Sequence, residues 1–167
     1  MISRVYISHS ERDEDLALEI SSSLWRIGLE SYSTMYIPSP GLTRADKVSF
    51  GVRNSECLVA VISQEGRNSA IVGQEIGLAR GIDLLIIPLL EKGVELPFLL
   101  ENLKPITFSR ERCCDAIGVL IKSLRDLSRL EWLKVKCPEC SEEMTQYLTS
   151  QEEVDGALER GFSLETI

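Results

Sequence analysis

The chain has 167 residues, which is enough for one domain of ordinary size and a small appendage, and its hydrophobic content of 44% supports a packed core. Its formal net charge of −8 argues against nucleic acid as a partner, because phosphate binding needs a basic surface. The sequence has no membrane-length apolar run and no signal-peptide pattern, and its five cysteines do not resemble a secreted disulfide framework, so we expect a cytoplasmic protein with no membrane partner.

Strand and helix patterns alternate along residues 1–130. Short runs rich in β-branched and apolar residues predict five strands, at 4–8, 30–37, 57–63, 83–90 and 105–108. Apolar residues at helical spacing predict four helices, from about 10 to 28, 43 to 54, 69 to 81 and 110 to 130. This alternation predicts an α/β domain with a flavodoxin-like, five-stranded parallel sheet in the order 2-1-3-4-5 and helices on both faces.

Several of the predicted helix ends carry capping residues. Ser10 and Asp13 resemble a capping box at the start of the first helix, and Thr43 with Asp46 has the same spacing at the start of the second. Gly28 is a plausible C-cap for the first helix. These signals predict where the two helices begin and where the first one ends.

Glu75 is an acidic residue on the apolar face of the third predicted helix. A helix turns by about 100° per residue, and on that wheel Glu75 lies between Ile71 and Ala79, inside the apolar arc. One interpretation is a partly exposed carboxylate that forms a surface ion pair, with Arg67 or Arg80. The other is a carboxylate that faces a ligand.

Flavodoxin-like domains bind ligands in a crevice at the carboxyl ends of strands 1 and 3, where the strand order reverses. The loops at these positions are SHSERDE and QEGRNS, and the second leads into the helix with Glu75. The chain has no phosphate-binding loop and no dinucleotide fingerprint, and His9 is its only histidine. A carboxylate with hydroxyls and backbone amides suits cleavage of a glycosidic bond, where the carboxylate faces an oxocarbenium-like sugar.

Four stretches together make the chain resemble a TIR domain of the microbial type over about residues 2–110. They are RVYISHSERDEDLALEISSSLWRIGLESY, the PSPG loop, ECLVAVISQEGRNSAIVGQEIGLARG, and IIPLL with ELPFL. The resemblance implies the flavodoxin-like sheet and one of two functions. Many microbial and plant members cleave NAD at the nicotinamide–ribose bond, releasing nicotinamide and ADP-ribose or a cyclic isomer, commonly in defence against phage. Other members only assemble with TIR domains as signalling scaffolds.

The resemblance also assigns residues. Glu75 matches the family's catalytic glutamate, which contacts the nicotinamide-side ribose and stabilises the positive charge that develops there. Because nicotinamide leaves as a neutral base, no strong general acid is needed. Ile71 stands where the family often has tryptophan, so a stacking surface is missing. The residues that the resemblance implies for substrate binding are Ser8, His9 and Ser10 after the first strand, Pro40 and Gly41 at the pocket mouth, and Asn68, Ser69 and Ile71 around the helix start.

The same resemblance implies which partners the protein binds. Activity in such enzymes usually needs self-association through TIR surfaces, which brings the mobile loop of one domain against the pocket of another. The alternative is a non-catalytic module that recruits another TIR protein or effector, and the isoleucine at position 71 favours it. A third interpretation is an enzyme similar to nucleoside deoxyribosyltransferases, which also set a glutamate against a sugar.

Residues 131–167 differ in composition and predict a partial, zinc-ribbon-like tail. Cys137-Pro-Glu-Cys140 is a knuckle that presents two thiolates from one tight turn, whereas a structural Zn²⁺ needs four ligands. The second pair lies beyond this sequence, or comes from a second chain, or the knuckle is an empty turn. The other predictions for the tail are a strand at 144–149 and a short helix from a capping box at Ser150 and Glu153 to Gly161.

Overall fold

The computed structural model describes residues 2–33, 40–128, 132–136, 138–140, 143–147, 159–160 and 163–166. The chain divides between Lys122 and Ser123 into two compact units. Among the described residues, no helix combines the length and the apolar character that crossing a membrane requires.

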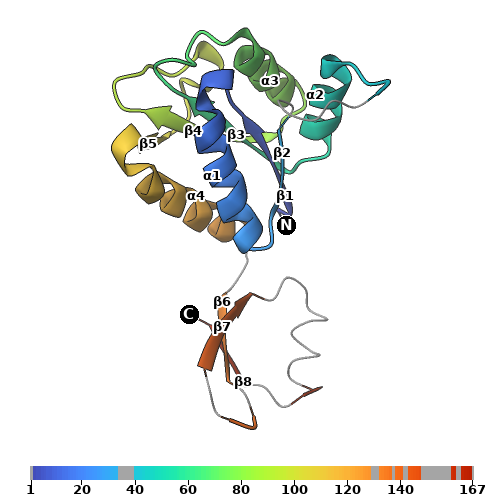
Figure 1. The fold of residues 1–167 in the computed structure, drawn as a ribbon, viewed down its shortest axis with the longest axis vertical. Coiled ribbons are helices and arrows are strands. Elements are labelled where there is room, and N and C mark those ends of the chain that lie inside the picture. Colours follow the sequence, from blue (N-terminus) through green and yellow to red (C-terminus); the bar gives the residue numbers. More distant parts are fainter. Residues whose placement is uncertain are drawn as a thin grey trace. The chain divides into compact units, whose positions relative to one another are not determined.

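The first unit contains a five-stranded parallel sheet. Its strands are β1 (Arg4–Ser8), β2 (Glu30–Tyr32), β3 (Cys57–Ile62), β4 (Leu85–Glu91) and β5 (Ile106–Phe108). They lie in the order β2-β1-β3-β4-β5, and each neighbouring pair is parallel (Figure 1). Every residue of β3 is buried, as expected of a central strand with helices on both faces. The predicted flavodoxin-like sheet is confirmed.

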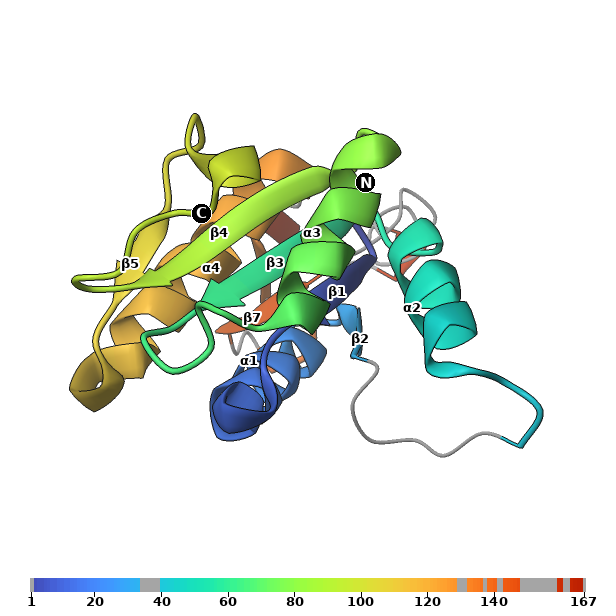
Figure 2. The same cartoon turned by 90° about the horizontal axis from the view of Figure 1, so that it is seen from above.

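Helices cover the two faces of this sheet (Figures 1 and 2). One face carries α1 (Glu14–Arg26) and the first part of α4 (Cys113–Ser128), and the other carries α2 (Arg44–Arg53) and α3 (Ala70–Gly81). Short 3-10 turns lie at Glu11–Asp13, Phe98–Leu100 and Arg110–Arg112. Side chains alternate between the faces of a strand, so Tyr6 and Ser8 of β1 share one face. Tyr6 belongs to the core cluster that includes Val72 and Ile76 of α3.

One capping prediction is confirmed and one is wrong. Thr43 Oγ1 accepts a hydrogen bond from Asp46 N at 3.1 Å, and Asp46 Oδ2 accepts one from Thr43 N at 2.9 Å, which completes the box. Ser10 forms no side-chain cap, because its hydroxyl donates to the Asp13 carboxylate at 2.6 Å, and α1 begins only after a 3-10 turn. Gly28 has a φ of 79°, the left-handed conformation that often follows a helix C-terminus.

Several boundaries differ from the prediction. β2 contains only three residues, and residues 34–37 of the predicted strand lie outside the described part of the chain. The last predicted helix starts as a 3-10 turn at Arg110–Arg112, so α4 itself begins at Cys113. Neither difference moves a residue of the predicted site.

Cys57, the first residue of β3, is a thiol without access to solvent. Burial, together with the negative charge of Glu56, raises the pKa of its thiol to about 12. Because the thiolate is the reactive form, we expect Cys57 to stay unmodified by iodoacetamide at about pH 8 while the exposed Cys114 is alkylated. Mass spectrometry of the labelled, folded protein measures both sites. Alkylation of Cys57 as fast as that of Cys114 would contradict the buried position of β3.

The second unit contains a three-stranded antiparallel sheet. Its strands are β6 (Trp132–Lys136), β7 (Glu143–Tyr147) and β8 (Ser163–Thr166), in the order β7-β6-β8. The strand predicted at 144–149 is confirmed as far as β7 extends, whereas β6 and β8 have no counterpart in the prediction. The helix predicted between Ser150 and Gly161 lies mostly outside the described residues.

The predicted zinc knuckle lies at the turn between β6 and β7. Pro138–Cys140 form this turn and Cys140 is exposed, while Cys137 lies outside the described residues. In the part of the chain that the structure describes, no group of three or more His, Cys, Asp or Glu side chains could hold a metal ion. The knuckle offers two thiolates, half of what a structural Zn²⁺ requires, so zinc binding stays a prediction.

Candidate functional site

Glu75 lies on the side of α3 that faces the sheet, and its residue is only 2% exposed. Tyr6 Oη donates a hydrogen bond to Glu75 Oε1 at 2.7 Å, and Ser8 Oγ donates one to Oε2 at 2.5 Å. The interpretation of Glu75 as a partly exposed surface carboxylate is therefore wrong. Arg80, one of the partners considered for it, donates instead to the carbonyl oxygen of Leu99 at 2.9 Å.

A pocket of about 340 Å³ reaches the Glu75 carboxylate between α2 and α3. Arg44, Ala45 and Val48 of α2 and Ile71, Gln74, Glu75 and Leu78 of α3 line it. Its walls are mainly apolar, with one carboxylate, one guanidinium and one carboxamide among the lining groups. This composition is typical of small-molecule sites, in which a few polar groups orient a ligand within apolar walls. The volume suits a nucleoside-sized part of a ligand.

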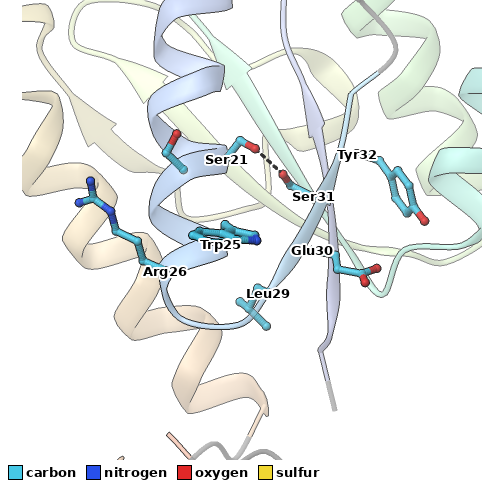
Figure 3. A pocket seen from close by; sticks show the side chains of 8 residues that line it. Ser21, Trp25, Arg26, Leu29, Glu30, Ser31 and Tyr32 are labelled. Carbon is cyan, nitrogen blue, oxygen red and sulfur yellow. Dashed lines mark hydrogen bonds between the residues drawn. The ribbon is translucent and has the colours of Figure 1, made fainter. Parts of the chain in front are cut away.

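A larger pocket of about 630 Å³ lies elsewhere, between α1 and β2 (Figure 3). Trp25 lies along it, and Ser21 and Ser31 are hydrogen-bonded across it at 2.7 Å. Its acidic residue, Glu30, is exposed and forms an ion pair with Arg4 at 3.1 Å. None of the residues predicted for substrate binding lines this pocket and its one carboxylate, Glu30, is exposed, so size alone does not make it the better candidate.

His9 is not in the pocket of Glu75. It lines a separate cavity of about 70 Å³ together with Ala17, Leu18 and other residues. The His9 ring is 2% exposed, with Nε2 2.7 Å from Ser33 Oγ and Nδ1 2.9 Å from the Ser10 carbonyl oxygen. The structure thus places the two titratable residues of the predicted site in different cavities.

Ser10 belongs to a buried network centred on Asp13, which is 0% exposed. Asp13 Oδ2 accepts hydrogen bonds from Ser10 Oγ at 2.6 Å and from Ser63 Oγ at 2.7 Å, and Oδ1 accepts one from Arg110 Nη2 at 2.8 Å. A Cβ on Gly66 would lie 2.5 Å from Asp13 Oδ2, so only glycine fits over the network. These contacts join the loops that follow β1, β3 and β5 at the carboxyl edge of the sheet.

The charge of Arg110 is stabilised by the same network. Burial by itself would lower the pKa of Arg110, but the hydrogen bond and charge of Asp13, with the charges of Glu91 and Glu65, raise it above the ordinary value. The Arg110 guanidinium therefore stays positively charged at every pH at which the protein is folded. The loops that follow β1 and β3, where a ligand was predicted, are therefore joined to Arg110 by these contacts of Asp13.

Most of the other residues predicted for substrate binding precede α2 and α3 in the chain. Pro40 and Gly41 are exposed, and Gly41 has a φ of 83°, which favours glycine. Asn68 is exposed in the turn before α3, and Ser69 is the N-cap of α3, its Oγ accepting from Val72 N at 3.5 Å. Of all the predicted residues, Ile71 alone joins Glu75 among those that line the α2–α3 pocket, and Ser8 contacts the carboxylate.

Tyr6 and the pocket residues of α2 were not predicted from the sequence. Tyr6 lies two residues before Ser8, and the period of a strand puts both on the same face, so the pattern RVYIS already contained this signal. Arg44 and Val48 lie one helical turn apart on α2. No local pattern indicated that this side of α2 faces α3.

Comparisons with known proteins agree with this fold. A family model described as the TIR domain matches residues 5–121. The TIR domain of a Toll-related receptor from Hydra magnipapillata is 20% identical, with a TM-score of 0.61 over 75% of this chain and 99% of that chain. The TIR domains of the activated Roq1 resistosome are 10% identical, with a TM-score of 0.61 over 73% of this chain and 99% of theirs.

A third similar structure is an enzyme. The CMP N-glycosidase of Clostridium botulinum is 17% identical, with a TM-score of 0.55 over 72% of this chain and 98% of that chain. No curated protein matches the sequence. At these identities, the likeness to the solved structures shows the fold.

Proposed function

The chain belongs to the TIR domain family, and we propose that it cleaves the nicotinamide–ribose bond of NAD, giving nicotinamide and ADP-ribose or a cyclic isomer. The observation that carries this proposal is the Glu75 carboxylate, which is buried and yet lines a pocket of about 340 Å³. A buried carboxylate is costly unless it is hydrogen-bonded, and such groups gather at functional sites. We propose defence against phage, or immune signalling, as the setting.

The proposed chemistry needs one negative group beside the sugar. The nicotinamide ring of NAD is cationic while bonded to ribose and leaves as a neutral base, so no residue has to protonate it. As the bond breaks, positive charge develops on the ribose, and the Glu75 carboxylate stabilises that charge. Water or a group of the substrate itself then attacks the ribose, which gives the linear or the cyclic product.

We assign the other residues that line the α2–α3 pocket to parts of NAD by the chemistry of their side chains. In this proposal the apolar side chains of Val48, Ile71 and Leu78 contact the nicotinamide and its ribose, and the positive charge of Arg44, which also lines the pocket, binds the diphosphate. The volume holds one nucleoside, so the adenosine half extends outside. We propose that a second copy, docked through TIR surfaces with its Pro40–Gly41 loop at the mouth, contacts that half. The TIR domains of the resistosome support assembly as a property of this fold.

Substitution of Ile71 is predicted to change the affinity for NAD. The indole of Ile71→Trp adds a stacking surface for the nicotinamide. We therefore expect the KM for NAD to fall about fivefold to tenfold, with little change in kcat, because stacking on an aromatic side chain contributes at least about 1 kcal/mol. Steady-state kinetics of nicotinamide release measure this. Ile71→Leu, which adds no ring, is the matched control. A KM for Ile71→Trp equal to or above that of Ile71→Leu would refute the proposed position of the nicotinamide.

A second candidate function is a non-catalytic module that binds another TIR protein. The observation that favours it is that both oxygens of Glu75 already accept hydrogen bonds, from Tyr6 and Ser8, as they would in a purely structural carboxylate. Under this function, Glu75→Gln would leave binding to a TIR partner intact and no nucleotide would be consumed.

A panel of glycosidic substrates tests the proposal. The purified protein is incubated with NAD, with CMP, and with a deoxynucleoside plus a free base, and liquid chromatography follows the free bases. We expect release of nicotinamide from NAD alone. Cytosine release or base exchange without nicotinamide would replace NAD by another substrate, and an inert panel beside an active TIR enzyme would favour the non-catalytic module.

A further inference from the structure

We infer that Tyr6 and Ser8 are positioning residues that orient the Glu75 carboxylate. We also infer that α2 holds the Tyr6 ring in place, because the backbone of α2 packs against that ring at Gly51. The inference deepens the proposed NAD cleavage and rests on it, since it names the groups that aim the reacting carboxylate. Neither hydroxyl has to touch the substrate.

The hydroxyl groups of Tyr6 and Ser8 donate to different oxygens of the Glu75 carboxylate. Tyr6 Oη is 2.7 Å from Oε1 and Ser8 Oγ is 2.5 Å from Oε2, so each oxygen has its own donor. An ionised carboxylate oxygen has about two acceptor sites, and each hydroxyl uses one of them. Two donors on different oxygens fix the plane of the carboxylate. The direction in which the carboxylate faces the α2–α3 pocket is then fixed.

Both donor side chains, Tyr6 and Ser8, are buried and belong to a strand of the sheet. Tyr6 and Ser8 are each 0% exposed, so water does not compete for their hydroxyl groups. They lie on β1, where Tyr6 is paired with both β2 and β3 and Ser8 is paired with β3. Groups on a paired central strand hold a reacting side chain more precisely than groups on a loop. A glutamate on a helix would otherwise sample several rotamers.

Gly51 connects this arrangement to α2. A Cβ at position 51 would lie 2.7 Å from Tyr6 Cε2 and 3.0 Å from Cδ2, so the backbone of α2 lies directly against the tyrosine ring. The same helix carries Arg44, Ala45 and Val48, which form one wall of the pocket. A movement of α2 would therefore change the pocket wall and, through Tyr6, the orientation of Glu75.

The test is Tyr6→Phe, which removes the hydroxyl and keeps the ring. We expect kcat for nicotinamide release to fall about tenfold to a hundredfold with KM changed less than about twofold, since misorientation of a reacting group costs rate rather than binding. Tyr32→Phe is the matched control, because Tyr32 is the register partner of Tyr6 on β2 and its ring packs edge-on against Phe50. It should leave both constants unchanged. Gly51→Ala, which crowds the ring of Tyr6, should lower kcat as well.

A titration separates this inference from the proposed function. The ¹³C NMR signal of the Glu75 carboxyl group is followed against pH without substrate, in wild type, Tyr6→Phe and Tyr32→Phe. A hydroxyl that donates to a carboxylate favours its ionised form, so the midpoint should move to higher pH in Tyr6→Phe only. Arg44, the charged side chain across the pocket, is the same in all three proteins.

The outcomes are distinct. A midpoint that moves, with wild type inactive on NAD, supports the orienting hydrogen bonds and refutes the proposed function. Active wild type with kcat and midpoint unchanged in Tyr6→Phe overturns the inference and leaves the proposed function standing. A lower melting temperature of Tyr6→Phe, with kcat and midpoint unchanged, also overturns it, because Tyr6 would then serve packing alone.

Discussion

Glu75→Gln is expected to lower nicotinamide release from NAD about a hundredfold to a thousandfold, because a neutral amide cannot stabilise the positive charge that develops on the ribose. Glutamine has nearly the same shape as glutamate, and the hydroxyls of Tyr6 and Ser8 can still bond to its carboxamide. The melting temperature should therefore stay within about a few degrees of wild type. Initial rates of nicotinamide release, normalised to folded protein, measure the effect.

Glu101→Gln provides a control that carries the same change of charge. Glu101 is exposed and lies outside the pocket residues, so this variant should keep wild-type activity. Retention of more than about a tenth of the wild-type rate by Glu75→Gln would contradict a reacting role for the carboxylate, since loss of one transition-state contact costs about 10²–10³-fold.

Asp13→Ala is expected to cause the largest loss of stability, a fall of about 3 kcal/mol in the free energy of unfolding. The substitution leaves two buried hydroxyls, of Ser10 and Ser63, without their acceptor. The Arg110 side chain is 40% exposed and can turn towards water, which keeps the loss below that of a fully buried ion pair. Urea unfolding followed by circular dichroism measures the change.

Asp115→Ala is the comparison for this variant. Asp115 also forms an ion pair with an arginine, Arg112, at 2.7 Å, but the two side chains are 60% and 77% exposed. An exposed pair contributes little, so the cost should stay below about 1 kcal/mol. Equal losses in Asp13→Ala and Asp115→Ala would show that the buried network does not hold the carboxyl-end loops together.

The sheet could be predicted from the sequence because its signals are local. The run CLVAVIS is apolar enough to indicate a strand buried on both faces, and alternation with helices determines parallel pairing. The helical period also puts Glu75 between Ile71 and Ala79, but it left a partly exposed carboxylate and a ligand-facing one as alternatives, and only the structure shows that Glu75 is buried. The antiparallel strands β6, WLKVK, and β8, SLET, were not predicted, because an alternation over four or five residues is too short to distinguish a strand from a loop.

The contacts between loops could not be predicted. Ser10 and Asp13 have the spacing of a capping box, and the alternative partners of Asp13 are 50 and 97 residues away in the sequence, at Ser63 and Arg110. No pattern in the neighbouring sequence indicates that the Asp13 carboxylate bonds to these distant side chains instead of taking part in a capping box. His9 follows β1 directly, and only the folded chain shows that its ring lies in a different cavity from Glu75.

The pocket wall formed by α2 is a similar case. Its helix start could be predicted from Thr43 and Asp46, but which side faces α3 depends on how α2 packs against Tyr6. Gly51 permits this packing because it has no Cβ. A glycine inside a helix usually indicates lower helix stability, so its presence in the sequence did not indicate a close contact with Tyr6.

The most direct test of NAD cleavage at this site is a ¹H NMR time course of NAD with the wild-type protein at increasing protein concentration. The account predicts that free nicotinamide appears as NAD disappears, at a rate per molecule that rises with protein concentration because assembly completes the pocket. NAD that stays intact at the highest concentration, while a TIR enzyme of known activity consumes it under the same conditions, would contradict the account.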